Sequence, residues 1–229
     1  MKNILLKAIS TGILSIATLT YFSGCKKDGP SNETILKNRI SDVIPQKYLD
    51  TLKKLQFPIN DGTNPPNMEG AYFANHLILK ASNLPSDVIG NQFHDAKFKL
   101  FDQSIKDFGI SLIGEHFLTL NDTSIVTAIS GSGNNFTVYG KVKSTTGTKS
   151  AIFAIIISGT KDGNNIKNYT EGLINIDNSN GGTGVFLPEG KARIVYDSDL
   201  VSERINYDDE VSVTPKNNAI GLLNAAANK

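Results

Sequence analysis

Apolar and polar side chains alternate along much of the chain from residue 68 onward. In the clearest run, Ala96, Phe98 and Leu100 take one parity and the lysines between them take the other. A period of two places alternate side chains on opposite faces of a β-strand, whereas a helix needs a period near 3.6. We therefore predict a mainly β domain over residues 68–200.

Turn-forming residues separate the alternating runs. Asp162-Gly163 is typical of a tight hairpin, and we expect a type I′ turn there. The run Ala151–Ile157 is continuously apolar, which predicts a strand covered on both faces. About eight strands with short links, and no long helical patterns between them, predict an antiparallel sheet. Two architectures stay open, a closed eight-stranded barrel and a sandwich.

A short helical segment, residues 34–60, precedes the strands. Pro45 suits the first turn of a helix, because its missing N–H would be unbonded there anyway. Tyr48, Leu49 and Leu52 then form one apolar face. Such a helix either packs on the β domain or binds a partner, and we expect packing.

The first 24 residues have the layout of a secretory signal peptide. Lys2 and Lys7 precede an uncharged stretch, residues 8–24, that is led by isoleucines and leucines. A membrane-spanning helix needs about 20 strongly apolar residues, and this stretch is shorter and diluted by serines and threonines. We therefore expect a cleaved signal rather than a retained anchor.

The signal ends in Phe22-Ser23-Gly24-Cys25, and Cys25 is the only cysteine of the chain. Two small residues before a cysteine resemble the lipobox of bacterial lipoproteins, with Phe22 in place of the usual Leu. The resemblance implies that Cys25 is acylated and becomes the N-terminus, so that residues 25–33 form a lipidated tether to the membrane. The following Lys26-Lys27-Asp28 is similar to lipoproteins of Bacteroidota-type bacteria. That resemblance implies an outer-membrane protein and leaves export to the cell surface open.

A second resemblance concerns the β domain. Gly70-Ala71-Tyr72 opens the first expected strand, and Arg193 lies in the last. This arrangement is similar to lipocalin-type barrels, in which an arginine from a late strand covers a Gly-x-Trp motif, although this chain has no Trp. The resemblance implies a barrel that holds one small ligand. We expect Tyr72, Arg193, His76 and His116 to line its pocket, with hydrogen-bonded core histidines as the alternative.

Composition and motifs argue against several other functions. The chain has 23 basic and 22 acidic residues, a balance that does not predict nucleic-acid binding. We find no Gly-x-Ser-x-Gly motif and no P-loop, and the three histidines lack the spacing of metal ligands. The sequence therefore predicts no catalytic residue, no metal and no cofactor.

These observations together predict a lipid-anchored envelope protein with a non-catalytic binding or interaction module. Its expected partners are the membrane, through Cys25, and an unknown small ligand or envelope protein. The alternatives are a structural or assembly component of the outer membrane and a surface hydrolase. A hydrolase would need a carboxylate pair or a Ser/His site from distant strands, and a cleft with Glu115 or Glu171 near a histidine would favour it. Residues 201–229 form a C-terminal extension for which the pattern allows either an edge strand and helix or no fixed structure.

Overall fold

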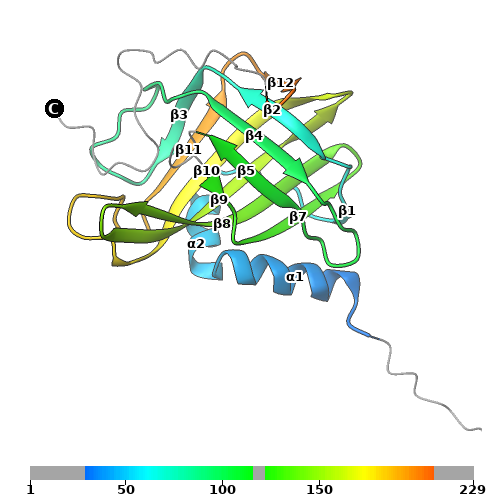
Figure 1. Cartoon of the computed structure of the whole chain (residues 1–229), viewed down its shortest axis with the longest axis horizontal. Coiled ribbons are helices and arrows are strands. Elements are labelled where there is room, and N and C mark those ends of the chain that lie inside the picture. Colours follow the sequence, from blue (N-terminus) through cyan, green and yellow to red (C-terminus); the bar gives the residue numbers. More distant parts are fainter. Residues whose placement is uncertain (1–28, 116–121, 209–229) are drawn as a thin grey trace, which may run out of the picture.

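The computed structural model describes residues 29–115 and 122–208 (Figure 1). The predicted signal peptide, Cys25, His116 and the last 21 residues lie outside these ranges. Two helices come first, α1 (Asn32–Val43) and α2 (Gln46–Lys54). Twelve strands follow. They are β1 (Thr63–Asn64), β2 (Gly70–Ala74), β3 (Leu77–Ser82), β4 (Ala96–Phe101), β5 (Ser111–Glu115), β6 (Asp122–Thr123), β7 (Val126–Ser132), β8 (Asn135–Thr146), β9 (Lys149–Asp162), β10 (Asn165–Asn180), β11 (Ala192–Asp197) and β12 (Val201–Ile205).

The predicted helical segment ahead of the strands is confirmed. The Ser31 side chain caps α1 by accepting a hydrogen bond from the Thr34 backbone N–H at 3.3 Å. Pro45 stands immediately before α2, and Tyr48, Leu49 and Leu52 are the buried side chains of that helix. The apolar face therefore packs on the sheet, as expected for a helix with one apolar stripe.

The sheet is continuous and open, so the predicted closed eight-stranded barrel is wrong. The strands run in the order β1-β7-β8-β9-β10-β12-β2-β4-β5-β6, and β11 and β3 branch off β10. The paired strands of the described ranges are antiparallel except β1 and β7, and no ladder joins β6 to β1. The two ends nevertheless approach each other, since the Ile129 N–H donates to the Phe108 carbonyl at 2.8 Å.

The sheet branches at β10, which changes partner along its length. Residues 166–167 pair with β12, whereas residues 170–174 pair with β11. Between them the ladder shifts register at Asn168, whose φ is +54°. A bulge of this kind bends a strand and redirects its pairing. One half of the sheet therefore continues through β12 into β2, while the other branches through β11 into β3.

The halves of the sheet enclose one hydrophobic core, and the helices enclose a second one on the outer face. In β9, Phe153, Ile155 and Ile157 face the inner core, while Ala154 and Ile156 face the helices. The prediction that this strand is covered on both faces is therefore confirmed. Figure 1 shows α1 and α2 lying along the outer side of β7–β10.

Apolar and polar residues alternate loosely over residues 69–80, yet this run is broken into β2 and β3. The break is a turn in which His76 has a φ of +51°. Since β2 pairs with β4 and β12 while β3 pairs with β11, the two strands belong to different branches. The alternation that includes Tyr72 therefore does not predict the orientation of His76.

Candidate functional site

Tyr72 is part of the packed interior of the sheet. Its side chain is fully buried, its ring centroid lies 5.4 Å from that of Phe98, and its hydroxyl donates to the Met68 carbonyl at 3.2 Å. Burial raises the pKa of Tyr72 above its usual value, so the group stays neutral. This tyrosine stabilises the core of the sheet.

Arg193 is also fully buried, where it forms a bidentate ion pair. Its Nε and Nη2 donate to the two carboxylate oxygens of Asp87, each at 2.8 Å. Although burial opposes ionisation, hydrogen bonds from Arg193 and Ser82 hold the pKa of Asp87 below its usual value. The arginine that lies against the Gly-x-Tyr motif is instead Arg204, since a Cβ at Gly70 would come 2.7 Å from its Cζ.

His76 lies at the surface, on the turn between β2 and β3. Its backbone N–H donates to Asp95 at 2.8 Å, and its Nδ1 lies 3.8 Å from an oxygen of Asp199. The side chain is half exposed, whereas Tyr72 and Arg193 are enclosed. The structure therefore does not gather the three described candidates around one pocket.

A buried carboxyl that sequence reasoning missed lies near this turn. Asp197 is fully buried and accepts a hydrogen bond from Ser202 Oγ at 2.7 Å. Burial, together with the neighbouring Asp199, raises the pKa of Asp197 to about 7. The sequence signal for this burial is the alternation along β11, because Asp197 has the same parity as the buried Arg193 and Val195.

The glutamates considered for hydrolysis have structural partners. Glu171 is buried on β10 and accepts a hydrogen bond from the Tyr169 hydroxyl at 2.9 Å. Burial and the Glu171 charge raise the pKa of Tyr169 well above its usual value. Glu115 pairs with Lys97, with 3.1 Å between Oε1 and Nζ.

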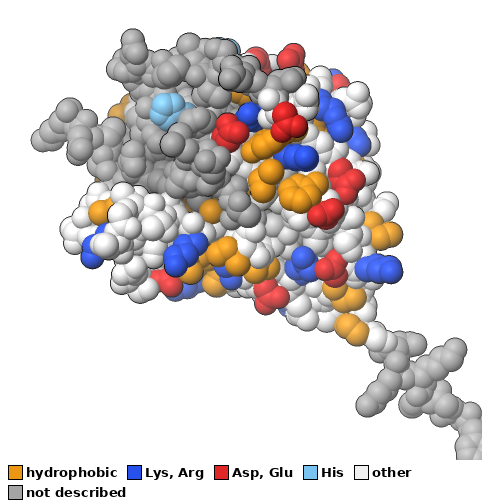
Figure 2. All heavy atoms as spheres, in the orientation of Figure 1, with side chains coloured by type: hydrophobic (Ala, Val, Ile, Leu, Met, Phe, Trp, Pro, Cys, Tyr) orange, Lys and Arg blue, Asp and Glu red, His pale blue; other side chains and the backbone are white. Residues whose placement is uncertain are grey.

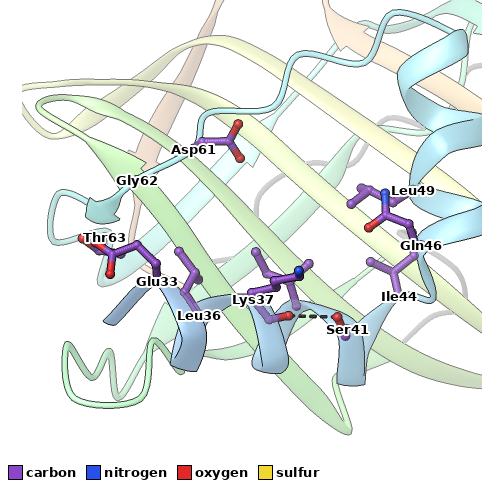
Figure 3. Close-up of a pocket in the computed structure, with 11 residues that line it drawn as sticks. Glu33, Leu36, Lys37, Ser41, Ile44, Gln46, Leu49, Asp61, Gly62 and Thr63 are labelled. Carbon is purple, nitrogen blue, oxygen red and sulfur yellow. Dashed lines mark hydrogen bonds between the residues drawn. The ribbon is translucent and has the colours of Figure 1, made fainter. Parts of the chain in front are cut away.

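The structure offers a candidate binding site in a groove between α1, the start of α2 and the segment that leads into β1 (Figure 3). Its volume is about 240 Å³. We call it the helix groove. It is lined by Glu33, Leu36, Lys37, Ile40, Ser41, Ile44, Gln46, Leu49, Asp61, Gly62 and Thr63. The apolar residues of this set form its floor, and Figure 3 shows Glu33, Lys37 and Asp61 around its rim.

The wall of the groove opposite α1 is fixed tightly to the sheet. Asn60 donates through its side-chain amide to the Phe136 carbonyl and to Ser158 Oγ, and its own carbonyl accepts from Ser130 Oγ at 2.6 Å. Gly62 has a φ of +130°, and a Cβ there would lie 2.5 Å from the Gly131 carbonyl oxygen. Only glycine allows this close approach, which holds the wall in place without any ligand.

The groove carries charge only at its rim. Glu33, Lys37 and Asp61 are all exposed, and none of them takes part in the ion pairs found between described residues. Backbone N–H groups at the start of α1 and the Ser31 hydroxyl lower the pKa of Glu33, so it is ionised at neutral pH. An apolar floor with a few charged groups at the rim suits a small amphipathic molecule.

Comparison with family models, with curated proteins and with solved structures gave no significant match for this chain. Among residues 29–115 and 122–208, no three histidine, cysteine or carboxylate side chains converge in a way that could hold a metal ion. None of the helices in that part of the chain has the length and apolar character needed to cross a bilayer.

Proposed function

We propose that this protein is a lipid-anchored lipoprotein of a bacterial cell envelope, held in the outer membrane by acylated Cys25. The observation that carries the proposal is the position of the chain's only cysteine, directly after Ser23-Gly24 at the end of an uncharged apolar stretch. Several acyl chains on one residue give stable anchoring, where a single chain would be marginal.

The start of the folded part supports the same reading. Ser31 already caps α1, so only six peptide steps separate Cys25 from the first helix. An extended chain covers at most about 3.5 Å per residue, which limits this tether to roughly 20 Å. The helix groove, whose Glu33 and Leu36 belong to the first turns of α1, would then lie close to the membrane surface.

We further propose that the folded part is a non-catalytic binding module and that the helix groove is its binding site. The groove combines an apolar floor with charged groups at its rim and has a wall that glycine and hydrogen bonds hold in place. The interior of the sheet, where the lipocalin resemblance placed the pocket, is occupied by packed aromatic side chains.

An assembly component of the envelope is the second candidate function. The observation that favours it is an exposed apolar patch on β3, β11 and the loops beside them. Ile89 and Leu200 are 60% and 51% exposed there, next to the half-buried Ile78 and Tyr196. Contiguous exposed apolar surface often marks a protein contact.

Metabolic labelling tests the anchor. Cells that express the full chain are grown with an alkynyl palmitate analogue and then fractionated. The wild-type protein should carry the label and remain with the membranes. The Cys25→Ser variant should lose the label and be released, whereas Ser23→Ala, which keeps a small residue before the cysteine, should behave like the wild type. A Cys25→Ser protein that is still labelled, or still sediments with membranes, contradicts the proposal.

Protease treatment of intact cells then distinguishes export to the cell surface from a location in the inner leaflet of the outer membrane.

A further inference from the structure

We infer that the helix groove binds a single-chain amphiphile with a cationic head group, such as an alkyl ammonium. This inference rests on the proposed function, since it names the ligand class of the proposed binding site. It is carried by the shape of the groove floor, by the charges at the rim and by the place where the chain enters α1.

The floor of the groove is an apolar strip. Leu36, Ile40 and Ile44 follow one another at intervals of four residues, so they lie along one face of α1 and its end. Ile40 is partly exposed, whereas Leu36 and Ile44 are 7% and 1% exposed and mainly pack the helix on the molecule. Eight residues of helix rise by roughly 12 Å, a length that suits an unbranched alkyl chain.

The volume of the groove limits the length of the chain. The groove holds about 240 Å³. Liquid water occupies about 30 Å³ per molecule, and a methylene group is of similar size, so the groove takes at most roughly eight such groups. An extended chain of about eight carbons also fits within the 12 Å strip. Carbons beyond that number would remain in solvent.

The rim favours a positive head group. It presents two carboxylates, Glu33 and Asp61, against one ammonium, Lys37. Figure 3 shows Asp61 on the wall opposite α1, so a head group above the floor lies between carboxylates on both sides. The other nearby cation of α1, Arg39, is turned away and donates to Asp107 and to the Thr127 carbonyl.

The position of the groove supplies the route for such a ligand. With Cys25 acylated, the tether of roughly 20 Å keeps the groove within reach of the bilayer surface. Single-chain amphiphiles partition between bilayer and water and leave the bilayer more readily than two-chain lipids, because fewer methylenes are buried.

Photo-crosslinking of the full-length protein in washed membranes tests the inference. The probe is an octylamine that carries a diazirine on its chain, and matched octanol and octanoate probes provide neutral and anionic controls. We expect the octylamine probe to label residues 33–49, about two- to fivefold more than the neutral probe, which is the range for an exposed ion pair. Alkyltrimethylammonium ions of increasing chain length should compete with the probe. Their competition should improve about fourfold per added methylene up to the octyl compound and then level off.

Two pairs of variants separate the groove from the rest of the surface. Ser41→Trp fills the groove and should lower labelling about fifteenfold, the effect of excluding about two methylenes. Asn38→Trp places the same ring on α1 outside the groove and should change nothing. Asp61→Asn should remove the preference for the cationic probe, while Asp102→Asn, which neutralises an exposed carboxylate just after β4, should keep it.

The outcomes separate this inference from the proposed function. Equal labelling by the neutral or anionic probe overturns the cationic ligand class and leaves the binding site in place. Labelling that avoids residues 33–49 with every probe overturns the groove as the binding site. A palmitate experiment in which Cys25 is not acylated overturns the proposed anchor, and it affects neither of the two crosslinking results.

Discussion

Two carboxyl groups buried in the β domain have opposite electrostatic settings. Asp87 faces the guanidinium of Arg193 and stays ionised, because the ion pair and its hydrogen bonds outweigh the cost of burial. Asp197 has the Ser202 hydroxyl and the like charge of Asp199 as neighbours, so burial favours its neutral form. At the scale of single residues, Asp197 is therefore the group that should make stability depend on pH.

We predict that Asp197 makes the protein less stable as the pH rises from about 4 to about 7. The folded pKa of about 7 lies above the ordinary value of 3.8, so in this window the folded state holds a proton that the unfolded state has lost. Stability then falls with rising pH and levels off above the folded pKa, by an amount on the order of 4 kcal/mol. Urea unfolding between pH 4.5 and 7.5 measures it.

The Asp197→Asn variant should lose this slope, because an amide carries no titrating proton. Asp50→Asn, which removes an exposed carboxyl on α2, should keep it. Asp87 and Asp107 have lowered pKa values, so their titration changes the stability only below about pH 4, outside this window. A variant at position 197 that retains the wild-type slope would show that another group is responsible.

Parity predicted which side chains turn inward but could not choose their partners. Phe98 and Leu100 are buried as the alternation of residues 95–102 required. Arg193, by contrast, was expected beside Tyr72 and instead pairs with Asp87, 106 positions away in sequence on a loop. Period-two patterning is a local property of one strand, whereas an ion pair depends on which segments the fold brings together.

At the scale of elements, α2 holds the helical layer on the sheet. Leu52 is fully buried, and its Cδ2 would lie 3.4 Å from a Cβ at Gly172 of β10, where the Phe57 ring would lie at 3.0 Å. The absence of a side chain at position 172 therefore lets the leucine and the phenylalanine approach the strand closely. This contact positions the α2 end of the helix groove, which includes Leu49.

We predict that Leu52→Ala destabilises the protein by about 2–5 kcal/mol, because the cavity between α2 and β10 cannot collapse against a rigid sheet. Lys53→Ala, at the next and exposed position of the helix, should change the free energy of unfolding by no more than about 0.5 kcal/mol. Denaturant midpoints of both variants measure the difference. Equal effects would mean that α2 contributes little to the folded state.

The helices could be predicted from sequence, but the helix groove could not. The place of Pro45 and the apolar stripe of α2 are local signals, and each corresponds to an observed feature. The groove needs Asp61 and Gly62 opposite α1, a juxtaposition that only the close approach of Gly62 to β7 creates. The sequence signal for the groove is the spacing of Leu36, Ile40 and Ile44. Packing of α1 on the sheet explains this spacing equally well.

At the scale of the whole molecule, one irregular strand gives the sheet its branch. The shift at Asn168 lets β10 pair with β12 on one side of that residue and with β11 on the other. No composition or period marks Asn168 as a bulge. The sheet is open at another place, since no ladder joins its end strands β1 and β6 among the described residues.

Antiparallel pairing follows from short turns such as the one at Asp162-Gly163. Gly163 has a φ of +58°, whereas the φ of the next residue, Asn164, is not positive. This is the pattern of a type II′ turn, so the expected type I′ turn is wrong.

The open sheet has a rigid centre and weak edges, and hydrogen exchange should show this gradient. β9 pairs with β8 and β10 along most of its length and is buried on both faces, so its amides at residues 153–157 should exchange only through global unfolding. β1 consists of Thr63 and Asn64, pairs only with β7 among the described strands, and should exchange by local opening, many times faster. Low concentrations of denaturant provide the control, because they accelerate exchange steeply where unfolding is global and weakly where it is local. Comparable rates and denaturant dependences in β9 and β1 would contradict a centre built on β8–β10 and would place the stability of the molecule in the helical layer instead.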